Sequence, residues 1–171
     1  MLLLGLMVVG CEKEYEAPEE QPVLFEYRYV NFAWGYSEHG WLIDAEGEVH
    51  RYDFPEDYRL PDSLGYICVE DLNYNLTQCD SILDSVESAD LDYYVGLIQG
   101  ASGGQILDME NVAADAGIST LSCYLYIPHK DMYKYVFLAQ SGDWEQINDS
   151  REAKTLVTWL KEIGEVFWLA I

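Results

Sequence analysis

Positive charge is scarce in this chain. Its 171 residues contain 9 Lys and Arg against 31 Asp and Glu, which gives a formal net charge of -22. Nucleic-acid binding needs a basic stripe that neutralises phosphates, whereas the few cations here are scattered along the sequence. We therefore exclude nucleic acid as a partner. The same charge opposes adsorption to an anionic membrane through the protein's own side chains.

Long hydrophobic runs are absent after the first ten residues. The uncharged apolar run 1–10 is itself too short to span a bilayer. Half of the chain is nevertheless apolar and 14% of it is aromatic, so the composition excludes intrinsic disorder and collagen. The length fits one globular domain.

The common motifs for catalysis and metal binding are missing as well. The sequence contains no Walker loop, nucleophile elbow or GxGxxG, and its three histidines show no HxxxH spacing. The cysteines form no CxxC pair of the kind that binds zinc. Three acids within residues 44–48 superficially resemble a calcium loop, but the EF-hand spacing of ligands is missing. We therefore expect no cofactor and no metal site.

The run 1–10 has the character of a signal-peptide core and ends in Val8-Val9-Gly10-Cys11. This tetrapeptide resembles the bacterial lipobox, in which an aliphatic residue, a small residue and a cysteine form the processing site of lipoproteins. The resemblance implies that Cys11 carries a diacylglyceryl group and that residues 1–10 are removed. Two or three acyl chains suffice for stable anchoring to the membrane. The run lacks the Lys or Arg with which such signals begin, and the alternative is an apolar N-terminal element of the core.

Residues 11–22 differ sharply from the run before them, since they include five Glu and two Pro. This composition cannot bury a core and predicts a tether, which leaves residues 23–171 as a single domain. The acids in residues 12–16 also resemble the surface-export signals of Bacteroidetes lipoproteins. We therefore expect a lipid-anchored protein of the bacterial cell envelope, and the second resemblance implies display at the cell surface.

The remaining cysteines are Cys68, Cys79 and Cys123, an odd number that allows at most one internal disulfide. We interpret all three as small buried hydrophobes. A bridge from Cys79 to either of the other two remains an alternative.

Alternation with a period of two predicts strands over residues 24–34, 41–44, 48–54, 118–127 and 133–139. A short Gly-containing connection makes the second and third strands a hairpin, and a turn at 128–131 does the same for the last two. We expect Glu26, Arg28, Ser122 and Tyr124 to face outward. The two prolines and the charges of residues 55–65 predict a surface loop.

Helical periodicity predicts helices over residues 69–84, from Ser88 to the glycines at 103 and 104, and from Asp149 to Gly164. Asp149 followed by Glu152 is typical of a capping box, and Gly164 is a typical helix stop. Residues 165–171 are then an edge strand or a docked tail. The order βββ-αα-ββ-α predicts an α+β fold, with an antiparallel sheet of about five strands packed against about three helices.

One block, residues 31–49, combines glycines with large rings. It resembles a segment of uncharacterised small secreted or lipid-anchored bacterial proteins, and that resemblance implies a family but no activity. Trp34, Tyr36, His39 and Trp41 lie at an expected strand-loop-strand junction, where they are candidates for a platform that binds sugar or peptide. The alternative is that these rings fill the core.

Two classes of function follow from these observations. The first is a lipid-anchored, non-enzymatic binding or accessory module whose partner is a glycan or an envelope protein, and we prefer it. The second is a small extracytoplasmic hydrolase with His39 or His50 as general base and an acid that orients it. An open aromatic face would favour the binding module, whereas a cleft joining a histidine, an acid and a hydroxyl would favour the hydrolase.

Overall fold

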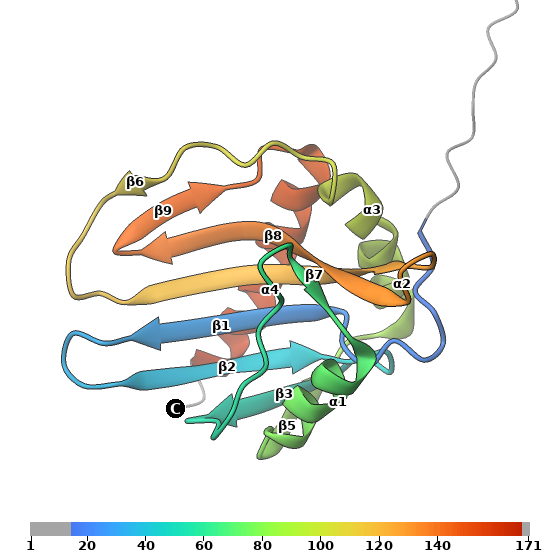
Figure 1. Ribbon diagram of the computed structural model, residues 1–171, viewed down its shortest axis with the longest axis horizontal. Coiled ribbons are helices and arrows are strands. Elements are labelled where there is room, and N and C mark those ends of the chain that lie inside the picture. Colours follow the sequence, from blue (N-terminus) through green and yellow to red (C-terminus); the bar gives the residue numbers. More distant parts are fainter. Residues whose placement is uncertain (1–14, 169–171) are drawn as a thin grey trace, which may run out of the picture.

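The computed structural model describes residues 15–168, with side chains to residue 165, and it shows one nine-stranded antiparallel sheet. Eight strands follow the order β5-β3-β2-β1-β7-β8-β9-β6, and β4 pairs with β8 (Figure 1). The strands are β1 (Phe25–Asn31), β2 (Ser37–Ile43), β3 (Glu48–Asp53), β4 (Tyr66–Ile67), β5 (Ser81–Ser85), β6 (Glu110–Asn111), β7 (Ile118–Ile127), β8 (Met132–Gly142) and β9 (Trp144–Ile147). Cys11 and the expected signal segment lie outside the described residues.

Three helices of nine residues or more accompany the sheet, together with one helical turn. They are α1 (Val69–Thr77), α2 (Ser88–Gly96), α4 (Arg151–Trp168) and the four-residue α3 (Ile98–Ala101). Helix α4 lies behind the sheet in Figure 1, while α1 and the segment before β4 lie in front of it. The expected α+β class is confirmed, with more strands than the five predicted. Within residues 15–168, no helix combines the length and apolarity needed to cross a membrane.

Both faces of the sheet contribute to a core, one against α2, α3 and α4 and the other against α1. One core cluster joins β1, β2, β7 and β8 to α2, α3 and α4, and it includes the edge-to-face pair Phe25–Trp159. A second cluster joins the opposite face to α1 through Leu42, Tyr52 and Leu72. Each strand in the middle of the sheet therefore buries odd and even positions alike.

This second core corrects the outward assignment of four residues on β1 and β7. Glu26, Ser122 and Tyr124 are buried, and the side chain of Arg28 is largely covered. Alternation with polar residues predicts a one-sided sheet, but here the polar positions of one face lie beneath α1 and the loop that leads to β4. The hydroxyl and carboxyl groups bond to one another, which allows their burial.

The predicted helix 69–84 is wrong in its second half. Helix α1 ends at Thr77, and residues 81–85 form strand β5 at the edge of the sheet. The backbone N–H of Asp80 donates to the carbonyl of Arg51, and Ile82 pairs with His50. Apolar residues at helical spacing occur on both sides of this boundary, so periodicity alone does not mark it. Strand β5 provides hydrogen-bond partners for backbone groups of β3 that would otherwise be unpaired.

The second predicted helix is divided at Leu97 into α2 and α3. Its apolar face is confirmed, because Leu91, Val95, Ile98 and Ala101 all belong to the first core cluster. Helix α2 begins at Ser88, the predicted start, and Glu87 is its N-cap residue.

Helix α4 departs from its predicted limits at both ends. The Ser150 hydroxyl accepts the N–H of Ala153, so Ser150 caps the helix, while Asp149 accepts the N–H of Gln105. The helix also continues through Gly164 to Trp168, which replaces the edge strand or docked tail expected there. A glycine inside a helix costs only about 1 kcal/mol, and the packing of the apolar face outweighs that cost.

Strand β2 begins at Ser37, so the predicted break at 35–40 is wrong for its last four residues. Position 40 lies inside the strand. It is a glycine because a side chain there would collide with the carbonyl oxygen of Tyr27 and with the Tyr52 hydroxyl. The glycine that reads as a turn in the sequence is thus needed for a close approach between strands. His39 consequently lies in a strand and not in a loop.

Residues 15–22, which the composition assigns to the tether, pack against the domain. The Gln21 side chain is buried and donates to the carbonyl oxygens of Val23 and Tyr124, at 2.9 Å each. The Tyr15 hydroxyl accepts the N–H of Tyr126 at 3.0 Å. A segment without apolar periodicity is held here by hydrogen bonds to strand β7.

The three described cysteines are free thiols, so neither of the alternative disulfides is formed. Cys68 is only partly buried and its thiol donates to the Asp71 carboxylate, so the prediction of a buried hydrophobe is wrong for this residue. Cys123 is fully buried and Cys79 packs at the edge of the second core cluster, as expected for small hydrophobes. Burial raises the pKa of the Cys79 thiol to about 12, which makes it a poor nucleophile.

Candidate functional site

Four aromatic side chains stand in solvent at one end of the sheet. Phe32, Trp34, Tyr36 and Phe54 are between 50% and 85% exposed, and Trp34 is the most exposed of them. The Tyr36 ring lies 5.4 Å from Phe32 and 6.4 Å from Phe54, measured between ring centroids. We call these four residues the aromatic tip. Exposed apolar groups gathered in one place mark interaction sites more often than isolated ones do.

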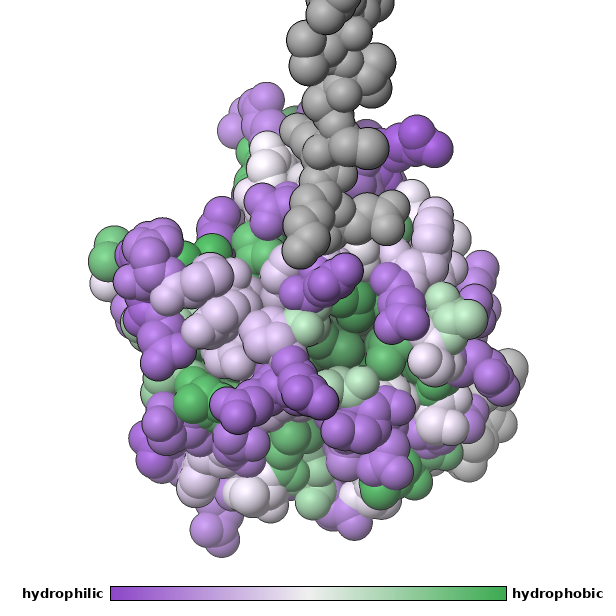
Figure 2. Space-filling model, turned by 90° about the vertical axis from the view of Figure 1, so that its right-hand side faces the viewer, coloured by the Kyte–Doolittle hydropathy of each residue, from purple (hydrophilic) through white to green (hydrophobic). Residues whose placement is uncertain are grey.

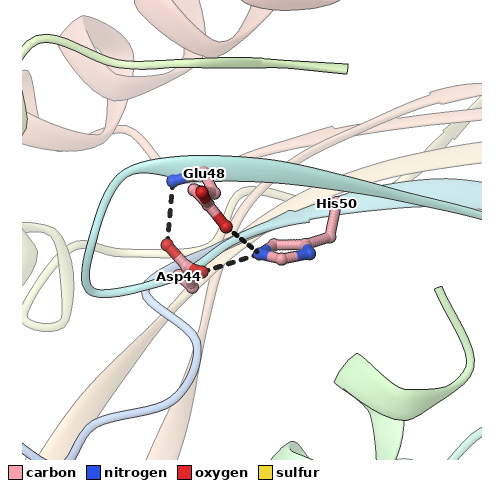
Figure 3. Close-up of side chains that lie close together, drawn as sticks. All are labelled: Asp44, Glu48 and His50. Carbon is pink, nitrogen blue, oxygen red and sulfur yellow. Dashed lines mark hydrogen bonds and ion pairs between the residues drawn. The ribbon is translucent and has the colours of Figure 1, made fainter. Parts of the chain in front are cut away.

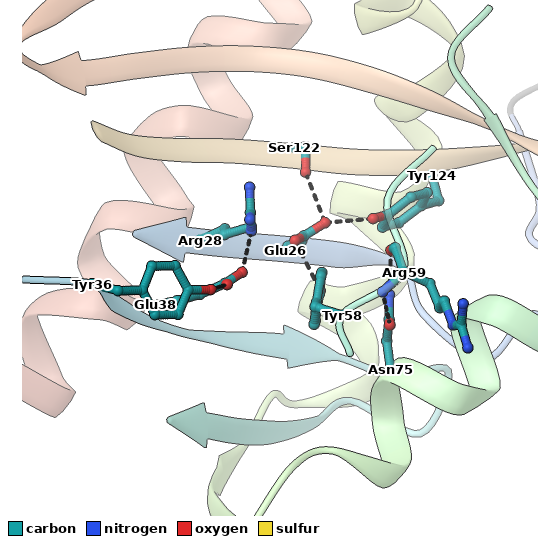
Figure 4. Close-up of polar contacts among 9 residues, drawn as sticks. All are labelled: Glu26, Arg28, Tyr36, Glu38, Tyr58, Arg59, Asn75, Ser122 and Tyr124. Atoms are coloured by element: carbon teal, nitrogen blue, oxygen red, sulfur yellow. Dashed lines mark hydrogen bonds and ion pairs between the residues drawn. The ribbon is translucent and has the colours of Figure 1, made fainter. Parts of the chain in front are cut away.

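The aromatic tip is held by specific polar contacts. The Tyr36 hydroxyl donates to the Glu38 carboxylate, whose other oxygen accepts the Arg28 Nε–H at 2.6 Å (Figure 4). The backbone N–H of Phe54 donates to the carbonyl of Glu38 at 2.8 Å. Since Glu38 is buried and bonds to both sides, it fixes the rings of Tyr36 and Phe54 relative to β2. The Tyr36 side chain and the Phe54 backbone are therefore held in place before any ligand arrives, and Phe32 packs on the Tyr36 ring.

Further along the same face of the sheet, beyond Arg28 and Glu38, lies a buried carboxyl group. Glu26 accepts hydrogen bonds from the hydroxyls of Tyr124, of Tyr58 at 2.9 Å and of Ser122 at 3.4 Å (Figure 4). Burial raises the pKa of Glu26 above its ordinary value of 4.5, although the hydrogen bonds from Tyr124 and Tyr58 oppose this shift. The site thus holds a carboxyl group that binds its proton more tightly than an exposed one.

The loop of residues 54–65 covers part of this face and leaves a pocket of about 390 Å³. Asn75 of α1 secures the loop through two 2.8 Å hydrogen bonds, because its side chain accepts the N–H of Arg59 and donates to the Arg59 carbonyl. Glu26, Arg28, Leu60, Ser122 and Tyr135 are among the residues that line the pocket. Its volume lies in the range of small-molecule sites, and Arg28 connects it through Glu38 to the aromatic tip.

The four ligand-binding residues predicted from the sequence do not form one surface. Trp34 and Tyr36 belong to the aromatic tip, whereas Trp41 is only 4% exposed and stacks on Tyr27 within the first core cluster. His39 lies on the same face of β2 as Trp41 and packs against the ring of Tyr29. Trp34 and Tyr36 are exposed, as a ligand-binding surface requires, and their role in binding stays a prediction. For Trp41, the alternative of core packing is the correct one.

The two histidines proposed as general bases differ in their surroundings. Burial lowers the pKa of His39, which favours its neutral form. His50 Nε2 lies 2.6 Å from Asp44 Oδ2 and 3.7 Å from Glu48 Oε2 (Figure 3). The contacts of His50 supply the acid that a hydrolase needs, but both are carboxylates and neither is a hydroxyl that could act as nucleophile. The structure thus gives the hydrolase hypothesis only two of its three components.

Several residues of this region were not predicted from the sequence. Phe32 and Phe54 join the aromatic tip, and Glu26, Arg28 and Glu38 form the polar floor beside it. The even-numbered positions of β1 and β2 share one face, and this period of two was the available signal. It did not reveal that a loop would cover that face and turn it into a pocket.

Comparison of the chain with protein-family models, with curated proteins and with solved structures gives no match.

Proposed function

We propose that this protein is a lipid-anchored, non-enzymatic binding module of the bacterial cell envelope. Its ligand is a neutral glycan that contacts the aromatic tip. The observation that carries the proposal is the exposure of four large rings at one end of the sheet, where Glu38 holds the Tyr36 hydroxyl. Such exposure contributes nothing to the core and creates a risk of association, so a binding role accounts for it best.

The chemistry beside the aromatic tip favours carbohydrate among the ligands that rings attract. Sugar hydroxyls donate to carboxylates and accept from guanidinium groups, and Glu26 and Arg28 both line the pocket on this face. The apolar faces of sugars pack on aromatic rings. The net charge of -22 disfavours anionic ligands, so a neutral glycan fits both the rings and the field of the molecule.

This surface lies far from the point where the described chain begins. Tyr15 contacts Tyr126 at one end of β7, whereas Ile118, at the other end, pairs with Val30 just before the aromatic tip. These two ends are ~27 Å apart at about 3.4 Å per residue. In Figure 1 the start of the described chain and the β1–β2 turn lie at opposite ends of the sheet. A chain held through Cys11 would therefore present its rings away from the membrane.

The end from which the N-terminal segment emerges is unlike the aromatic tip. Figure 2 shows this end covered mainly by hydrophilic residues, with smaller hydrophobic areas between them. Acids such as Glu19, Glu46 and Asp92 border a hollow of about 580 Å³ at this end. We therefore assign ligand binding to the aromatic tip. The opposite end is the one that faces the membrane in this proposal.

Affinity electrophoresis of the full chain against neutral glucans, mannans and xylans tests the proposal. We expect at least one polysaccharide to retard the wild type, and Trp34→Ala to weaken this binding about tenfold or more, a loss of ~1.4 kcal/mol. The folded state should tolerate the change within about 0.5 kcal/mol, because the indole is 85% exposed.

Trp144→Ala is the matched control, since Trp144 is also exposed but lies on β9, away from the aromatic tip. It should leave retardation unchanged. Equal losses in the two variants, or no retardation by any of these polysaccharides, would contradict the proposed function. Capture of an envelope protein that competes for Trp34 would replace the glycan with a protein partner.

A further inference from the structure

The hairpin between β2 and β3 gathers one imidazole and two carboxylates. Asp44 follows β2, and Glu48 and His50 are alternate residues of β3, so the turn brings the three side chains to one place (Figure 3). One ligand atom from each lies within 4.8 Å of the other two. From this arrangement we propose a binding site for a divalent transition-metal ion, with Zn²⁺ as its best-fitting member.

The distances between the ligand atoms suit such an ion. Tetrahedral zinc with bonds of about 2.1 Å requires ligand atoms ~3.4 Å apart. His50 Nε2 lies 2.6 Å from Asp44 Oδ2 and 3.7 Å from Glu48 Oε2, so one separation must open and the other must close slightly. Rotation of the partly exposed Glu48 side chain can supply part of this adjustment. The backbone need not move far.

The hairpin also orients the first ligand. Asp44 Oδ1 accepts the backbone N–H of Glu48 at 2.8 Å, which directs Oδ2 toward His50. Gly47 takes a positive φ of 84° and completes the turn, and a side chain there would press on the carbonyl of Val86. Supporting hydrogen bonds of this kind fix ligand geometry in metal sites.

Charge gives an independent argument for a cation. Two carboxylates outweigh one imidazole, whether or not the imidazole is protonated. Among the described side chains, His50 is the only basic group within ion-pair distance of Asp44 or Glu48. Asp44 is 7% exposed, so water neutralises its charge poorly. A divalent ion would balance this local excess of negative charge.

The ligand types select among divalent ions. An imidazole nitrogen with two carboxylates suits zinc and its first-row neighbours, whereas calcium takes six to eight oxygen ligands. Three protein ligands leave a fourth position of a zinc ion for water, and the partly exposed Glu48 admits solvent. The site therefore differs from the calcium loop that three acids of residues 44–48 suggest in the sequence, because His50 replaces Glu46.

Calorimetric titration of the untagged full chain with Zn²⁺, after removal of metal with a chelator, tests this site. We expect one Zn²⁺ per chain and a loss of affinity of about tenfold or more in His50→Ala and in Asp44→Asn. His129→Ala is the matched control, since His129 is exposed in the β7–β8 turn, and its titration should equal that of the wild type. Titration with Ca²⁺ should show weaker binding.

A second readout uses Co²⁺, whose visible absorption reports nitrogen ligation. The spectrum of the wild type should change in His50→Ala and stay the same in His129→Ala. If His50→Ala does not fold by circular dichroism, Glu48→Gln decides the question, because its half-exposed side chain can change without loss of the fold. No uptake of Zn²⁺, or uptake that none of the ligand variants weakens, would overturn the proposed site.

Discussion

At the scale of single residues, Glu26 shows how a polar side chain is tolerated in the second core. Its carboxyl group is 3% exposed and accepts three hydroxyl hydrogen bonds. Desolvation penalises the charged form and raises the pKa in the folded state, whereas the unfolded chain leaves it near 4.5. The folded protein therefore binds this proton more tightly than the unfolded one.

Linkage turns this difference into a dependence of stability on pH. Because the folded pKa is raised, the contribution of Glu26 is fully present below about pH 4.5 and is lost as the pH rises through the folded value. Glu26→Gln should remove this loss, so the variant gains stability relative to the wild type above pH 4.5, by at most ~1.4 kcal/mol per pH unit. Urea denaturation of both proteins from pH 4.5 to 8 measures the difference.

The control for this prediction is Glu56→Gln, which changes an exposed acid of the loop that covers the pocket. Its difference from the wild type should be nearly constant with pH. Parallel curves for the wild type and Glu26→Gln would show that Glu26 titrates in the folded protein as it does in the unfolded chain.

At the scale of elements, the polar segment of residues 15–22 behaves as an extension of the sheet surface. Gln21 is buried, although its neighbours Glu20 and Pro22 belong to a composition typical of tethers. Its amide donates to Val23 and to Tyr124, a residue on β7 that is distant in the sequence. These hydrogen bonds hold the segment in place, together with the packing of Tyr15 and Ala17 against the first core cluster.

Gln21→Ala should therefore destabilise the protein by about 1–3 kcal/mol, because it leaves the buried Tyr124 carbonyl without a donor. Glu20→Ala, next to it and exposed, should stay within about 0.5 kcal/mol. Thermal or urea denaturation checks both values. Equal and small effects would mean that residues 15–22 are a tether in solution, as their composition indicates.

At the scale of the whole molecule, the start of the described chain and the aromatic tip lie at opposite ends of the sheet. The strongly acidic chain would be repelled by an anionic membrane, so the proposed attachment depends on lipid. In the proposed function, a module anchored in this way turns its aromatic tip outward, toward ligands in the cell envelope. The proposal accounts together for the charge, the resemblance of residues 8–11 to a lipobox and the exposed rings.

The lipid itself is tested in cells of a bacterium that processes lipoproteins. Labelled palmitate should enter the wild type and not Cys11→Ser, because the resemblance to the lipobox places the acyl chains on that residue. Cys68→Ser, which alters another thiol with partial exposure, should be labelled like the wild type. Equal labelling of the wild type and Cys11→Ser would remove the anchor from the proposed function.

The sequence by itself determined the α+β class, both hairpins and the apolar faces of α2 and α4. Leu91, Val95, Leu156 and Leu160 recur at helical spacing, and packing of that stripe against a sheet is a local property of the pattern. It also indicated Trp34 and Tyr36 as candidate ligand-binding residues, because glycines and rings at a turn are visible without a fold, and both side chains are exposed. Segments whose burial depends on neighbours close in sequence were predicted well.

Only the tertiary structure decided that the second face of the sheet is buried as well. The sequence pattern predicts that Glu26 and Tyr124 face solvent, because they alternate with apolar residues. In the structure, α1 and the loop before β4 cover them. Strand β5 likewise pairs with the edge of β3, although its segment has apolar residues at helical spacing. The β2–β3 turn brings Asp44 close to His50. These outcomes depend on contacts between distant segments, which no local period of the sequence records.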